Sequence, residues 1–188
     1  MNKKERTRAA ILDATYGLFA RDGFNKITMK DICDVTGMSR GGLYSHFGST
    51  KEVFEAILDR INQKDEMNFQ DGMEAGMSAV TILDHALTLL REEMEHAEDS
   101  LSLAMYEYAC SCPGDRMDQL NKMGEKKWRD LIEYGMKRGE FNPVNVDEIV
   151  NVILYSYQGV RMWSRIVTMT TEVFDGIIHH IRKQLVKE

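Results

Sequence analysis

The stretch that decides the fold is TMKDICDVTGMSRGGLYSHF, residues 28–47. One pattern occurs twice in it: a capping residue, a short helical segment and then a glycine. The two repeats are Thr28 with the helix Met29 to Thr36 and Gly37, and Ser39 with the helix Arg40 to Phe47 and Gly48. Because only one glycine and one capping serine join the helices, the pattern predicts a steep crossing rather than an antiparallel pair.

The crossing helices have an inner and an outer side. The residues expected to form a small core are Ile32, Cys33, Met38, Leu43 and Phe47. The outer side carries Arg40, Gly41, Gly42, Tyr44, Ser45 and His46. Free backbone N–H groups at the start of the second helix suit a phosphate or a base edge. Tight helical corners also occur as purely structural features, so that alternative stays open from the spacing alone.

The same segment, with Lys51-Glu52-Val53-Phe54 behind it, resembles the signature of TetR-family transcriptional regulators, over roughly residues 4–64. The family pattern is approximately T-x-x-x-I-A-x-x-A-G-V-S-x-G-x-x-Y-x-H-F, then K-E-x-L/F. The matching positions are Thr28, Ile32, Gly37, Ser39, Gly41, Tyr44, His46, Phe47, Lys51 and Glu52. The departures are Cys33 and Thr36 for alanines, Met38 for a valine, and a turn before Lys51 that is one residue longer than the commonest spacing.

The resemblance implies a role in DNA binding for ten residues: Thr28, Lys30, Ser39, Arg40, Gly41, Gly42, Tyr44, Ser45, His46 and Lys51. Thr28, Lys30 and Lys51 would contact phosphates, and Tyr44 and His46 would hold the DNA backbone. Arg40 would reach a base edge, for which guanine O6 and N7 are the best geometric partners. Gly42 stands where a base-reading side chain is usual, so reading would depend on Arg40, Ser45 and the Gly42 backbone.

Charge is divided unevenly along the chain. The net charge is −6. Residues 1–51 hold nine Lys/Arg and five Asp/Glu, whereas the remaining residues hold fifteen Lys/Arg and twenty-five Asp/Glu. A basic N-terminal part and an acidic remainder favour one orientation of the protein on a polyanion. The cations Lys3, Lys4 and Arg6 are expected to follow the DNA backbone as a mobile arm. Chance variation of surface charge is the alternative explanation.

Helical periodicity continues to the end of the chain, which predicts an all-α protein of about nine helices. We expect an N-terminal three-helix helix-turn-helix domain at residues 1–64 and a C-terminal helical domain for ligand binding and dimerisation at residues 65–188. The further helices are expected at about Lys3–Arg21, Ser49 onward, Ala79–Ala97, Ser100–Cys110, Gly114–Lys137, Val146–Met169 and Thr171–Lys187. The stretch from Met67 to Ser78, with two glycines, is interpreted as a linker.

The helix from Val146 to Met169 is apolar on more than one face, so it has two surfaces to pack against. We interpret one as its own core and the other as the partner subunit of a homodimer, with Val152 or Ile153 facing the partner. A small-molecule pocket is expected from Met105, Tyr106, Trp128, Tyr155, Gln158, Arg161 and Trp163. Alternatively, Gln158 bonds across the dimer and Arg161 pairs with an acidic neighbour.

No catalytic motif or phosphate-binding loop is present, so we expect neither an enzyme nor a cofactor. We expect no metal site either: His179 and His180 are adjacent and diverge on a helix. Cys110 and Cys112 permit a thiophilic metal or a redox switch, but small apolar fillers are the favoured interpretation. Three cysteines, no apolar signal segment and no run of eighteen apolar residues predict a cytoplasmic protein that does not bind membranes.

Together these features predict a ligand-responsive, dimeric DNA-binding regulator. We expect a repressor that a small apolar or amphipathic effector releases from a palindromic double-stranded DNA operator. The alternative is a DNA-bound anchor or corepressor that docks a protein partner and has no small-molecule inducer.

Overall fold

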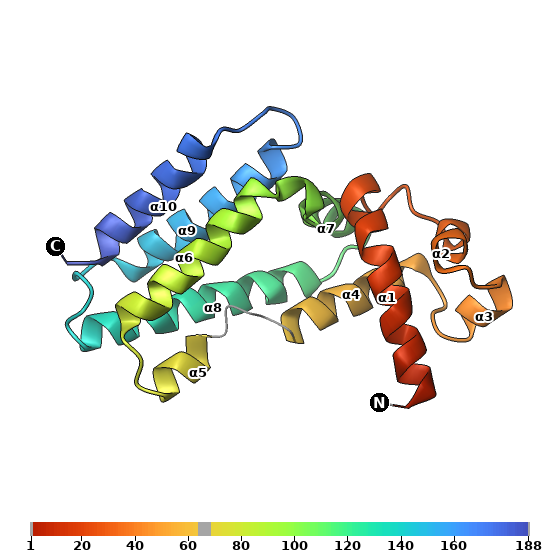
Figure 1. Ribbon diagram of the computed structural model, residues 1–188, viewed down its shortest axis with the longest axis horizontal. Coiled ribbons are helices and arrows are strands. Elements are labelled where there is room, and N and C mark those ends of the chain that lie inside the picture. The colour runs from red at the N-terminus through yellow and green to blue at the C-terminus, as the bar shows by residue number, and fades with distance from the viewer. Residues whose placement is uncertain (1, 64–68, 188) are drawn as a thin grey trace. The chain divides into compact units, whose positions relative to one another are not determined.

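A computed structural model describes residues 2–63 and 69–187 of the 188-residue chain. These residues form ten α-helices and one 3₁₀ turn, and their one β-interaction is an isolated bridge between Phe141 and Val186 (Figure 1). The helices are α1 (Lys3–Asp22), α2 (Met29–Thr36), α3 (Arg40–Tyr44), α4 (Thr50–Gln63), α5 (Phe69–Glu74), α6 (Ala79–Glu95), α7 (Ser102–Ser111), α8 (Arg116–Lys137), α9 (Val146–Trp163) and α10 (Thr171–Leu185), with the 3₁₀ turn at Ala97–Asp99. The all-α prediction is confirmed.

The chain divides into two compact units. Of the described residues, the N-terminal unit holds 2–63 and 99–113, and the second unit holds 69–98 and 114–187. The expected domain boundary between residues 64 and 65 lies outside the described residues. Helix α7 therefore belongs with the N-terminal helices, although residues 69–98 of the second unit precede it in the sequence.

Local sequence explains the helix starts of the N-terminal unit. Asn2 and Glu5 form a reciprocal capping box on α1, and Thr28 and Asp31 form another on α2. Helix α2 ends at Gly37, whose φ of +67° is a left-handed conformation that a glycine adopts without strain. The predicted corner core is confirmed for four residues that are at most 9% exposed: Ile32, Cys33, Leu43 and Phe47. Met38 is half-buried.

Four aromatic rings join helices α1, α4 and α7 in the N-terminal unit. The rings are those of Phe19, Phe24, Phe54 and Tyr108, and neighbouring centroids lie 5.0–6.4 Å apart. Phe19 and Phe54 are fully buried, so this cluster is the centre of the unit's core. Aromatic pairs at these separations stabilise a core beyond the area they bury. The cluster explains why α7 packs with α1 and α4.

The second unit is built from α5, α6, α8, α9 and α10, which lie around one apolar core (Figure 1). Trp128 of α8 packs edge-on against the ring of Phe69 of α5, with centroids 5.0 Å apart. Glu140 closes the start of α6: its carboxylate accepts hydrogen bonds from the Ser78 hydroxyl at 2.7 Å and the Val80 amide at 3.3 Å. No helix of the described residues is both long and apolar enough to cross a membrane.

Three elements differ from the expected pattern. Helix α3 ends at Tyr44 rather than Phe47, because the following residues bond back as a tighter turn, with the His46 amide on the Leu43 carbonyl at 2.9 Å. Helix α9 ends at Trp163 rather than Met169, where the Ser164 hydroxyl bonds the Val160 carbonyl at 2.6 Å. Part of the expected linker is helical, as α5.

Candidate nucleic-acid interface

The backbone of α3 is held from both ends by serine hydroxyls. The Ser39 Oγ accepts the Gly42 amide at 3.2 Å, and the Ser45 hydroxyl donates to the Gly42 carbonyl at 2.7 Å. Both bonds are made by the backbone of Gly42, the central residue of a helix that is only five residues long. The hydroxyl proton of Ser45 therefore serves the helix itself, which leaves base reading mainly to the longer side chains.

Those longer side chains project to solvent. Of the ten expected DNA-binding residues, eight are exposed and only Gly42 and His46 are half-buried. Arg40 begins α3, and the ring of Tyr44 at its end is 52% exposed although the neighbouring Leu43 is fully buried. A large exposed aromatic side chain next to a buried anchor is typical of a contact surface. The helix thus presents one cation and one phenol to a partner.

Capping interactions place further groups on both sides of α3. The exposed Thr28 hydroxyl donates to the Asp31 carboxylate at 2.6 Å, and this bond, together with the Thr28 amide, lowers the pKa of Asp31. At the start of α4, the Ser49 Oγ accepts the Glu52 amide at 3.2 Å. The Glu52 carboxylate accepts the Gly48 amide at 2.8 Å, one residue earlier than a standard capping box. Lys51 remains exposed on this first turn.

Two glycines leave part of the α3 backbone uncovered by side chains. A Cβ added at Gly41 would meet nothing within 4 Å, whereas one at Gly42 would lie 3.2 Å from the Ser39 Oγ. Gly41 is therefore free of any packing requirement within the chain, and Gly42 supports the cap. Absent side chains let a backbone approach a ligand closely. This geometry suits a helix that enters a groove.

Arg8 of α1 was not expected from the sequence as part of this site. Its guanidinium donates to the His46 carbonyl and lies 3.9 Å from the centroid of the Phe47 ring. Arg8 thus satisfies a backbone carbonyl two residues beyond the end of α3 and links α1 to this corner. The His46 Nδ1 is buried without a hydrogen-bond partner among the described residues, so Nε2 is the ring atom available to DNA.

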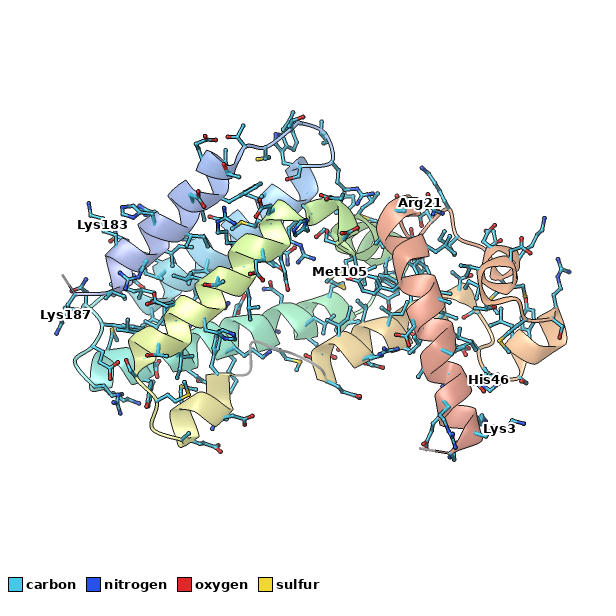
Figure 2. All side chains as sticks on the ribbon, in the orientation of Figure 1. Lys3, Arg21, His46, Met105, Lys183 and Lys187 are labelled. Carbon is cyan, nitrogen blue, oxygen red and sulfur yellow. The ribbon has the colours of Figure 1, made fainter. Side chains whose placement is uncertain are left out.

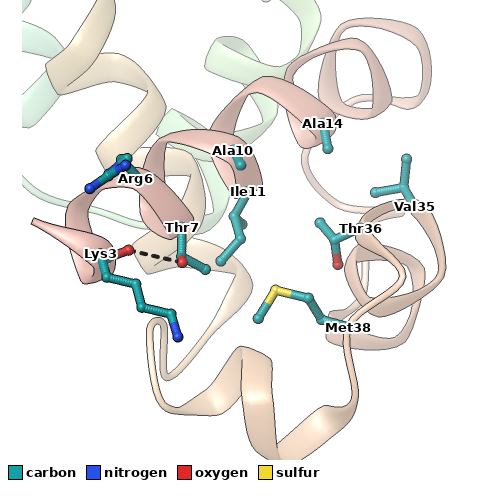
Figure 3. Close-up of a pocket in the computed structure, with 9 residues that line it drawn as sticks. All are labelled: Lys3, Arg6, Thr7, Ala10, Ile11, Ala14, Val35, Thr36 and Met38. Carbon is teal, nitrogen blue, oxygen red and sulfur yellow. Dashed lines mark hydrogen bonds between the residues drawn. The ribbon is translucent and has the colours of Figure 1, made fainter.

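The expected mobile arm is instead ordered helix, because α1 begins at Lys3. Lys3 and Arg6 line an open groove of about 680 Å³ between α1 and the corner of α2 and α3 (Figure 3). Its floor is apolar and includes Ile11 and Met38. Figure 2 places Lys3 and His46 among the side chains of the N-terminal unit. Lys3 and Arg6 add positive charge beside the exposed residues of α2 and α3.

The N-terminal unit thus combines a capped short helix, a stretch of backbone left uncovered by two glycines, and flanking cations. A family model described as "Bacterial regulatory proteins, tetR family" matches residues 11–57. The HTH-type transcriptional regulator YfiR of Bacillus subtilis is 30% identical over 146 residues, which span 75% of this chain and 71% of that protein. The chain belongs to the TetR family. This TetR-family protein is a DNA-binding transcriptional regulator and not an enzyme.

Two further comparisons agree with this assignment. The transcriptional repressor KstR2 of Rhodococcus jostii is 25% identical over 141 residues, covering 73% of this chain and 69% of that protein. A TetR transcriptional regulator from Chloroflexus aurantiacus has the same fold, with a TM-score of 0.79, 23% identity and full coverage of both chains.

The residues expected to form an effector pocket are spread over the structure. Met105 and Tyr106 belong to the N-terminal unit, and the other five belong to the second unit. Tyr106, Tyr155, Gln158 and Trp163 are exposed, whereas Trp128 is buried in the core. Arg161 lies 3.7 Å from the Glu93 carboxylate and stacks on the Tyr157 ring at 4.6 Å. The acidic pairing that was the alternative interpretation of Arg161 is therefore present.

The cysteines are all free thiols. Cys33 is buried in the corner core, Cys110 is exposed on α7, and Cys112 is half-buried at the end of that helix. Cys33 thus fills part of the corner core. The filler interpretation of Cys110 and Cys112 fits the exposed Cys110 poorly, and a metal or redox role for the pair stays a sequence-based alternative.

Proposed function

We propose that this TetR-family regulator is a homodimeric repressor whose two N-terminal units bind the half-sites of a palindromic operator. The observation that carries the proposal is an apolar surface left exposed on the second unit. Six large side chains of α9, of α10 and of the segment between them are 39–70% exposed: Val152, Tyr155, Trp163, Ile166, Val167 and Val173. Several large apolar side chains exposed on neighbouring segments are costly in water and are typical of a protein interface.

A homodimer is the occupant that fits the DNA-reading geometry. Helix α3 holds only five residues and offers Arg40 and Tyr44 as its long exposed side chains, so one unit contacts few base pairs. A two-fold axis doubles the contacts and matches an inverted repeat. The exposed position of Val152 supports this assignment, whereas Ile153 is 1% exposed and belongs to the subunit's own core.

The proposed effector is a small apolar or amphipathic molecule that binds the second unit. Its support is the abundance of polarizable and aromatic side chains, with thirteen methionines in the chain. Binding would favour a dimer geometry in which the two N-terminal units no longer match the half-sites. The name of the relative KstR2 supports repression rather than activation. The proposed place of action is the cytoplasm.

A second candidate is a DNA-bound anchor that docks another protein and has no small-molecule inducer. It is favoured by the exposure of Tyr155, Gln158 and Trp163, because exposed side chains of this kind suit a protein surface better than an enclosed pocket. The pairing of Arg161 with Glu93 also removes one polar group that a ligand was expected to satisfy.

The experiment begins with selection of duplexes from a random pool by the purified dimer. We expect recovery of an inverted repeat, and failure to enrich any duplex would contradict operator binding. A thermal-shift screen of apolar and amphipathic compounds follows, with each hit titrated against the protein–duplex complex. A hit that raises the melting temperature and dissociates the duplex supports the effector. Hits that never affect DNA binding favour the anchor.

A further inference from the structure

Helix α7 is part of the N-terminal unit, yet the chain enters it from the second unit and returns there after residue 113. It packs against α1, the loop between α1 and α2, and α4, without belonging to the helix-turn-helix segment. These contacts all lie within the N-terminal unit.

The central contact is the carboxylate of Glu107. It accepts the backbone N–H of Asn25 at 2.9 Å. It also lies against Gly23, where an added Cβ would come within 2.4 Å of a carboxylate oxygen. The φ of Gly23 is +83°, so this residue needs glycine for its conformation as well as for the close approach. The loop and the carboxylate are fitted to each other.

Two neighbouring residues of α7 strengthen this contact. The Ser111 hydroxyl donates to the Asn25 Oδ1 at 2.7 Å, one helical turn after Glu107. The Tyr108 hydroxyl donates to the Glu55 carboxylate of α4 at 2.6 Å. The Tyr108 ring meets the Phe24 ring edge-on, with centroids 5.3 Å apart. One turn of α7 thus holds both the loop and α4.

The loop controls where α2 begins. Only Lys26 and Ile27 separate Asn25 from Thr28, the residue that caps α2, and Ile27 is buried. A loop this short transmits a displacement of Asn25 to α2, against which α3 packs. We propose that Glu107 is a positioning residue for DNA binding, which holds the Asn25 amide and so fixes the placement of α2 and α3. The proposal rests on DNA binding by the N-terminal unit.

The direction of the change in DNA affinity distinguishes a positioning role of Glu107 from a purely electrostatic one. Glu107 is a negative charge in a unit that binds a polyanion, so its removal alone would strengthen DNA binding. Loss of a positioned loop would weaken DNA binding instead. Asp34 provides the matched control, since it is an exposed carboxylate on α2 with no hydrogen bond or ion pair among the described residues.

The test measures the affinity of each dimeric variant for a duplex that the wild-type protein selects from a random pool. We expect Glu107→Ala to bind about tenfold more weakly, the usual scale of one lost hydrogen bond, with an unchanged salt slope because no phosphate contact is lost. Glu107→Gln retains an acceptor oxygen and should bind at least as well as wild type. Asp34→Ala should bind equally or more tightly. Amide exchange at Asn25 should accelerate only in Glu107→Ala.

Glu107→Ala binding as tightly as wild type, or Glu107→Gln binding as weakly as Glu107→Ala, would overturn the proposal. If Glu107→Ala does not fold, Ser111→Ala replaces it and should bind about threefold more weakly. Wild-type affinity in Ser111→Ala would then overturn the proposal. A wild-type protein that selects no duplex contradicts operator binding itself, so the two failures are distinguishable.

Discussion

The two units of this TetR-family protein expose opposite kinds of side chain. The N-terminal unit buries the rings of Phe19 and Phe54 and presents Lys30, Arg40 and Lys51 to solvent around α3. The second unit buries a larger core and still leaves Trp163 and Ile166 more than half exposed. The first surface suits a hydrated polyanion and the second suits another protein. One chain therefore exposes two surfaces of different chemistry.

The difference also concerns how each surface is encoded. The N-terminal surface depends on caps and glycines that are close in sequence, such as Ser39, Gly42 and Ser45. The apolar surface depends on a helix with more hydrophobic residues than its own core uses. Mutations on the first should change DNA recognition, and mutations on the second should change assembly.

The largest effect is expected from a charge on the apolar surface. Val152→Glu should give monomers and weaken binding to a palindromic duplex by about 100-fold or more, because the second half-site is no longer linked to the first. Sedimentation and DNA titration measure the two effects. Met123→Glu on α8 is the matched control, since Met123 is 43% exposed and is not one of the six side chains of the proposed interface. Equal dissociation in both variants would contradict the interface.

Within the N-terminal unit, two cations should behave differently. Arg40→Ala should cost about 1–3 kcal/mol at one base pair and relax selectivity there, because a side chain on α3 reads a base edge. Lys51→Ala should weaken all duplexes alike and reduce the salt slope by about one. Affinity measured on single-base variants of the selected duplex separates these outcomes. Uniform weakening in Arg40→Ala would place Arg40 on the phosphates instead.

The smallest effect is expected in the second unit, at Glu140. Hydrogen bonds from Arg138 and then from Ser78 lower the pKa of Glu140 from 4.5 to about 2. A lowered carboxyl pKa stabilises the fold above pH 4.5, and this contribution is lost as pH falls toward 2. Glu140→Gln should lose about 1 kcal/mol of unfolding free energy at pH 7, because the partner Arg138 is 40% exposed and solvent screens the pair.

Urea unfolding of wild type and Glu140→Gln at several pH values checks this. The difference should shrink as pH falls below 4.5, while DNA binding at pH 7 stays unchanged. A difference that is constant with pH would mean that packing, and not the charge of Glu140, stabilises the start of α6.

Sequence reasoning succeeded where the determinants are local. Thr28 and Ser39 cap helices within three residues, so the corner core and the bounds of α2 followed from spacing. It failed where the determinants are distant. Arg8 reaches a carbonyl 38 residues away, and Glu107 reaches an amide 82 residues away. Neither residue stands in a local pattern that would mark its partner.

The predicted length of α3 and the predicted position of α7 were wrong for related reasons. Residues 45–47 carry a helical pattern but turn more tightly, because the Ser45 hydroxyl competes for the Gly42 carbonyl. Helix α7 joins the N-terminal unit through the Tyr108 ring, and one aromatic residue in a helical pattern does not reveal which core it enters. In the second unit, the same ambiguity left Ile153 and Val152 equally plausible as partner-facing residues.

The N-terminal unit of each subunit is proposed to bind DNA phosphates around a base-reading α3. The most direct measurement is the salt dependence of wild-type binding to the selected duplex. With about four phosphate contacts per subunit, log K should fall against log salt with a slope of about −7. A slope near zero, or a slope that Lys51→Ala and Lys30→Ala leave unchanged, would contradict the claim.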